Sequence, residues 1–130
     1  MWVGWPLERV LLLFVGLAFL LIFVQVTMFH SRQNFHHWSM WIPVLATPVD
    51  GVVSLLLAFY PVTWMKVLFT ILMWVSVFAG GFGAYRHTVG VRQRVGGYSQ
   101  RQNFLVGPPI ILPTLITAIG AVGLLALYWR

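Results

Sequence analysis

The chain has 130 residues, of which 60% are hydrophobic and only 8% are charged, and its formal net charge is +6. A soluble domain needs enough polar residues to cover its surface, so this composition excludes a soluble globular protein. The sequence contains no cysteine, which excludes disulfide bonds, thiolate metal sites and cysteine nucleophiles.

Four apolar runs, separated by short polar stretches, follow one another along the chain. About twenty helical residues span roughly 30 Å, which is the thickness of the hydrocarbon core of a bilayer. The runs therefore predict membrane-spanning helices at residues 10–29, 41–60, 62–84 and 108–129. A membrane β-barrel would need short segments of alternating polarity instead. We predict an all-α integral membrane protein with a single four-helix transmembrane domain over residues 1–130.

The tetrapeptide RQNF occurs twice, starting at Arg32 and at Arg101. When these two arginines are aligned, Gly51 falls on Gly120, and both second helices end in a pair of aromatic residues. This similarity predicts two tandem helical hairpins related as a parallel internal repeat. The predicted hairpins cover residues 10–60 and 62–129. In each copy we expect the asparagine to cap the helix that follows and the arginine to lie at headgroup level, or the two arginines to flank one pocket mouth.

Lysine and arginine are distributed unequally between the two ends of the predicted bundle. An even number of helices places both termini on one side, together with Arg9, Lys66 and Arg130. The other five basic residues all lie in the loops 30–40 and 86–107 on the opposite side. The positive-inside rule then predicts that these loops are cytoplasmic and the termini extracytoplasmic. Basic loops of this kind typically contact lipid headgroups, so we expect no nucleic-acid partner.

Asp50 lies within the second predicted helix near mid-membrane, where a charged side chain costs roughly 3 kcal/mol. We expect it to be neutral and hydrogen-bonded to Ser76 or Thr117, at similar depth, with Gln25 nearer the polar side. One interpretation is a structural hydrogen bond. The other is binding of a proton, a cation, a cofactor or a partner subunit. Glu8 is the only other acidic residue and lies at the opposite membrane face, so we predict no catalytic residues.

Histidines end two of the predicted helices that run in the same direction. His30 follows the first helix and His87 the third, so both should emerge at similar depth on the basic side. Two imidazoles on separate helices are the minimum for a bis-histidine haem b site. Together with Arg32 and Arg86 they would equally suit the border of a quinone pocket. The alternative is that these histidines contact lipid or a neighbouring subunit.

The remaining histidines, His36 and His37, are adjacent in the loop after the first helix. A zinc site needs three or four converging ligands, and no such motif occurs, so we predict no metal site. We expect both histidines and Arg101 to be interfacial residues.

Four helices with almost no soluble mass resemble the anchor or accessory subunits of larger membrane assemblies, which is an analogy of fold alone. We therefore expect a membrane subunit of a respiratory or other redox complex that holds a quinone or haem b and is not catalytic alone. Its partners would be the lipid bilayer and other membrane subunits or copies of itself. An oligomeric proton or cation channel, or a small transporter, using Asp50 is the first alternative. A structural or assembly protein with no cofactor is the second.

Overall fold

A computed structural model describes residues 2–129, which form helices and no strand. The elements in chain order are α1 (Leu7–Arg32), the single 3₁₀ turn η1 (Trp38–Met40), α2 (Trp41–Phe59), α3 (Thr63–Val95), α4 (Gln102–Val106) and α5 (Ile111–Tyr128). Four helices, namely α1, α2 with its preceding turn, α3 and α5, are long and apolar enough to cross a membrane. The predicted all-α fold with four membrane-spanning helices is confirmed, and the chain is a multi-pass membrane protein.

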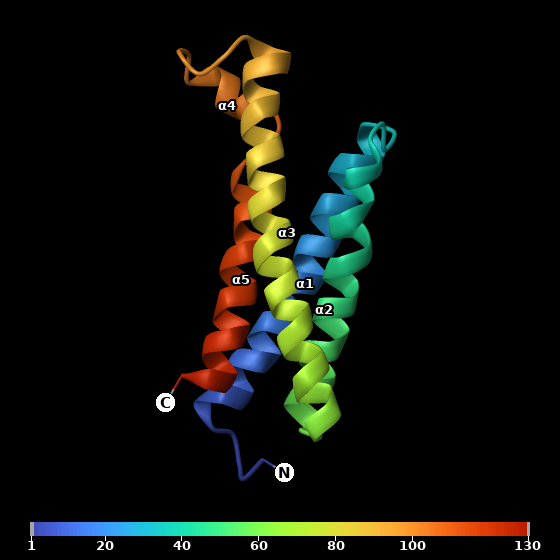
Figure 1. The fold of residues 1–130 in the computed structure, drawn as a ribbon, viewed down its shortest axis with the longest axis vertical. Coiled ribbons are helices and arrows are strands. Elements are labelled where there is room, and N and C mark those ends of the chain that lie inside the picture. The colour runs from blue at the N-terminus through green and yellow to red at the C-terminus, as the bar shows by residue number, and fades with distance from the viewer. Residues whose placement is uncertain (1, 130) are drawn as a thin grey trace.

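The helices pack as two antiparallel pairs. α1 has its most extensive contacts with α2, and α3 with α5, while α1–α5 and α2–α3 contacts join the two pairs. Both chain ends lie at one end of the bundle (Figure 1), as an even number of membrane crossings requires. Towards the opposite end the α1–α2 hairpin and the α3–α5 hairpin diverge (Figure 1).

Close backbone approach within each hairpin depends on a glycine in its second helix. A Cβ atom added to Gly51 would lie 3.1 Å from the carbonyl oxygen of Gly16, and one added to Gly120 would lie 3.1 Å from that of Met73. Small residues at such positions allow helices to approach closely in a membrane. Gly16 and His30 lie on α1, the first helix of one hairpin, and Met73 and His87 lie on α3, the first helix of the other. The spacing from Gly16 to Met73 equals that from His30 to His87, so Gly16 and Met73 occupy corresponding positions in the two hairpins. The internal repeat stays a prediction, which these corresponding contacts support.

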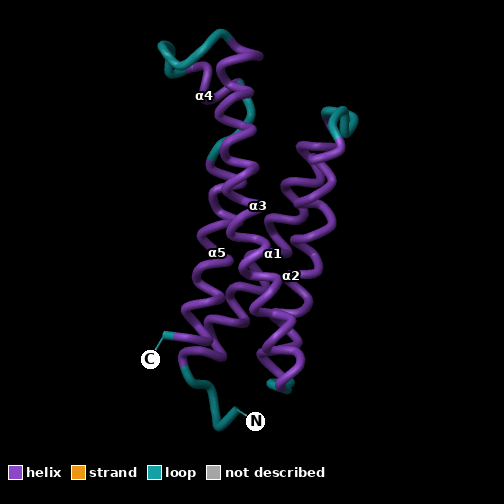
Figure 2. The backbone as a smooth tube through the Cα atoms, viewed as in Figure 1, coloured by secondary structure: helices purple, strands orange, loops and turns teal. Residues whose placement is uncertain are grey.

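The third helix is longer than its apolar run. It continues to Val95, well beyond the predicted end at residue 84, and rises above the turn between α1 and α2 (Figure 2). The helix ends at Gly96, whose φ of 99° is the left-handed conformation common after helix C-termini. The predicted loop from residue 86 onward was therefore wrong in its first part, because the end of an apolar run marks the membrane boundary and not the end of the helix.

The two RQNF copies do not cap the helices that follow them. Asn34 and Phe35 adopt positive φ values of 57° and 46° in the turn that ends α1, whereas Asn103 lies inside α4. The residues that precede α2 and α5 are Met40 and Ile110, and neither makes a side-chain capping bond. The capping prediction was wrong. In the first copy, asparagine instead tolerates the left-handed conformation that lets the chain reverse.

Candidate functional site between the two hairpins

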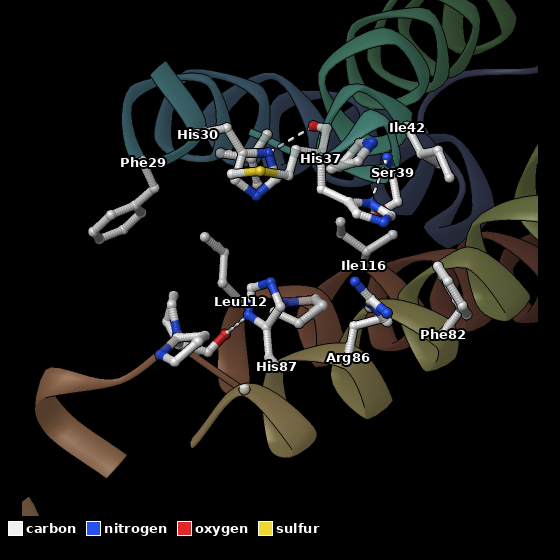
Figure 3. Close-up of a pocket in the computed structure, with 18 of the residues that line it drawn as sticks. Phe29, His30, His37, Ser39, Ile42, Phe82, Arg86, His87, Leu112 and Ile116 are labelled. Carbon is white, nitrogen blue, oxygen red and sulfur yellow. Dashed lines mark hydrogen bonds between the residues drawn. The ribbon is translucent and has the colours of Figure 1, made fainter. Parts of the chain in front are cut away.

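A cleft lies between the hairpins at the end of the molecule where they diverge, and its free volume is about 150 Å³. Its walls come from α1, α2, α3 and α5 and from the segments leading into α2 and α5 (Figure 3). Apolar residues including Phe29, Phe82, Leu112 and Ile116 form much of the lining. The titratable and charged residues of the lining are His30, His36, His37, Arg86, His87 and Arg94. None of the described lining residues is acidic, so the cleft is electrically positive or neutral.

His30 of α1 and His87 of α3 face each other across this cleft. Their ring centroids are 6.5 Å apart and the ring planes are inclined by 67°. His30 is buried and His87 is half-buried. The prediction from helix direction placed these residues at one depth, and the structure also turns them toward one another (Figure 3).

Each of the two imidazoles is oriented by a main-chain carbonyl group. Nδ1 of His30 bonds to the carbonyl oxygen of Met40, and Nδ1 of His87 to that of Pro109, both at 2.7 Å. A carbonyl oxygen only accepts hydrogen bonds, so each Nδ1 carries the hydrogen and Nε2 of the neutral ring is a free acceptor. Figure 3 shows the second nitrogen of each ring directed into the space between the rings. The spacing from Met40 to Pro109 equals the spacing between the two RQNF motifs. The two acceptor carbonyl groups therefore occupy corresponding positions in the two hairpins.

The arginines divide into two groups. Arg86 lines the cleft beside His87, whereas Arg32 is exposed and is not among the lining residues. Successive helical residues are rotated by about 100°, so Arg32 points nearly opposite to His30. Arg94 also lines the cleft and was not predicted, because it lies in the polar extension of α3.

Arg94 joins the two hairpins at the mouth of the cleft. Its guanidinium contacts Nε2 of His36 and donates to Oε1 of Gln33 at 3.3 Å. His37 lines the cleft too, and its Nδ1 is 2.8 Å from the hydroxyl of Ser39. The predicted interfacial residue Arg101 is exposed just before α4 and does not line the cleft.

Asp50 of α2 lies deeper in the membrane and is 1% exposed. The hydroxyl of Ser76, on α3, donates to its Oδ2 at 2.5 Å, and Ser76 also borders the cleft. The other predicted partners lie elsewhere. Thr117 donates to the carbonyl oxygen of Val77 at 2.8 Å, and Gln25 is exposed on the outer face of α1. Of the partners expected for Asp50, Ser76 makes the hydrogen bond, whereas Thr117 and Gln25 point elsewhere.

No group of three or more histidine or carboxylate side chains that could hold a metal ion occurs within residues 2–129. No family model, curated protein or solved structure matches this chain. The function is therefore inferred from the geometry of the cleft.

Proposed function

We propose that the protein is a membrane subunit of a redox complex and that the ring of a lipid-soluble quinone binds in the cleft between His30 and His87. The observation that carries this proposal is the pair of facing imidazoles, each held by a backbone carbonyl with its second nitrogen free. Phe82 would contact the apolar tail where the tail leaves the cleft, since this residue lines the cleft and is 45% exposed.

Imidazole suits the chemistry of both forms of a quinone. A neutral Nε2 accepts a hydrogen bond from a quinol hydroxyl, and a protonated one donates to a quinone carbonyl. Oxidation of a quinol releases two protons and two electrons, and the protons would pass to His30 and His87. The electrons would pass to a redox group of the partner complex. Arg86 and Arg94 supply positive charge that favours an anionic form of the ring.

The size of the cleft favours a single ring over a porphyrin. A cavity of about 150 Å³ in an apolar protein interior accommodates benzene, and the free volume here is about 150 Å³. Haem b is the second candidate, because the 6.5 Å ring separation resembles the span of two imidazoles on one metal ion. A porphyrin needs several times the area of one six-membered ring, so helix separation would have to increase before haem could enter.

Binding of a short-tailed benzoquinone to the detergent-solubilised protein tests the proposal. We expect His30→Ala and His87→Ala each to weaken binding about tenfold or more, as loss of a hydrogen bond to a buried site predicts. Arg32→Ala is the matched control, since this residue lies at the same end of α1 outside the cleft. A wild-type protein that binds no quinone would overturn the proposal. A reduced-minus-oxidised haem b spectrum that disappears in both histidine variants would replace quinone by haem.

A further inference from the structure

Asp50 is the one acidic residue in the middle of the four membrane helices, and no cation lies at its depth. Among residues 2–129, α2 has no other titratable or charged side chain, and those of the other helices lie towards one or the other end of the bundle. They are Glu8, Arg9, His30 and Arg32 on α1, Lys66 and residues 85 onward on α3, and Tyr128 on α5. A carboxyl group in this setting is held as the neutral acid, because nothing nearby balances a negative charge. The surroundings of Asp50 therefore favour its protonated form.

The carboxyl group is connected to only one end of the molecule. Ser76 donates to Oδ2 of Asp50 and itself borders the cleft that leads to His30 and His87. Towards the chain termini, by contrast, fully buried apolar side chains fill the space between the helices, among them Leu12, Leu57 and Phe69.

We infer that Asp50 is a proton-binding site that exchanges protons with the basic end of the molecule through Ser76 and the cleft. When Asp50 is ionised, the hydroxyl hydrogen of Ser76 passes to Oδ2 while the hydroxyl oxygen takes a proton from a hydronium ion in the cleft, which leaves a neutral water molecule. The reverse sequence returns the proton to the cleft. This inference does not depend on which ligand the cleft binds, and it goes beyond the proposed quinone site by assigning a second group that can hold a proton.

The near absence of acidic residues makes the site directly measurable by infrared spectroscopy. Glu8 and Asp50 are the only acidic side chains, so the carbonyl stretch of a protonated carboxylic acid can be assigned by substitution. In reconstituted protein at neutral pH we expect this band in the wild type and in Glu8→Gln. We expect it to be absent in Asp50→Asn. A wild-type protein without the band, or one whose band survives in Asp50→Asn, would overturn the inference.

The rate of hydrogen–deuterium exchange tests the route through Ser76. After transfer into D₂O, the band of Asp50 should shift, and Ser76→Ala should slow that shift at least tenfold. Ser54→Ala is the matched control, because Ser54 is equally buried but donates to the backbone carbonyl of Asp50 and not to its carboxyl group. Equal exchange rates in the two serine variants would show that Ser76 is only a structural partner. A protein that binds no quinone but exchanges the Asp50 proton through Ser76 would contradict only the proposed function. A protein that binds quinone but shows no effect of Ser76→Ala on exchange would contradict only this inference.

Discussion

His30 and His87 lie 57 positions apart in the sequence, yet their ring centroids are 6.5 Å apart across the cleft between two hairpins. Each ring is fixed to a carbonyl group within its own hairpin, at Met40 and at Pro109. The distance between the imidazoles therefore depends on how the two hairpins are placed against each other. Any ligand that bonds to both rings would also hold the diverging ends of the hairpins together.

Packing between α1 and α2 depends on the absence of a side chain at Gly51. A Cβ atom there would lie 2.7 Å from Cδ2 of Leu20 and 3.1 Å from the backbone oxygen of Gly16. We expect Gly51→Ala to lower the free energy of unfolding by about 1–3 kcal/mol, the usual cost of overpacking a close contact. Thermal unfolding monitored by tryptophan fluorescence measures the change.

The control for this variant is Gly81→Ala, because a Cβ atom on Gly81 meets nothing within 4 Å. Replacing an unobstructed helical glycine by alanine typically stabilises by about 0.5–1 kcal/mol. Gly81→Ala should therefore be neutral or stabilising. Equal destabilisation by both substitutions would show that the close approach at Gly51 is not what the hairpin depends on.

Orientation in the membrane is predicted by the excess of basic residues in the loops 30–40 and 86–107. The chain contains no cysteine, so single cysteines can be introduced without background labelling. In intact cells we expect Gly4→Cys to react with a membrane-impermeant thiol reagent and Ser99→Cys to react only after permeabilisation. The opposite pattern would reverse the predicted orientation while leaving the fold unchanged.

The helices were predictable from sequence because the length of an apolar run is a one-dimensional property. The facing of His30 and His87 was partly predictable, since helix direction gives depth along the membrane normal. The direction of a side chain around its helix is a separate variable, which only packing determines. For this reason Arg32 and Gln25 were placed near the site although they point away from it. Arg94 was missed because it lies in the polar extension of α3, beyond the apolar run that predicted the helix.

Access to the cleft can be measured with a cysteine at Ala79, which lies one turn from Ser76 and lines the cleft. We expect Ala79→Cys to react with a small water-soluble methanethiosulfonate reagent in reconstituted vesicles. The reaction should occur from the side that carries the loops and not from the side of the termini. Ala58→Cys is the matched control, because Ala58 is 0% exposed in the packed region near the termini. Reaction of Ala79→Cys from both sides would contradict one-sided access to Asp50.

The charge of the cleft should affect ligand binding separately from the histidines. Arg86 of α3 lines the cleft and Arg32 of α1 does not, although each lies close in sequence to one of the two facing histidines. Removing a charge that interacts with a ligand across partly solvated space typically costs about 0.5–1 kcal/mol, or a few-fold in affinity. We therefore expect Arg86→Gln to weaken binding of the quinone analogue a few-fold and Arg32→Gln to leave it unchanged. The difference should shrink as salt concentration rises, because mobile ions screen partly exposed charges. Equal effects of both substitutions would mean that Arg86 acts only through the general surface potential. Arg86 would then not interact specifically with a ligand in the cleft.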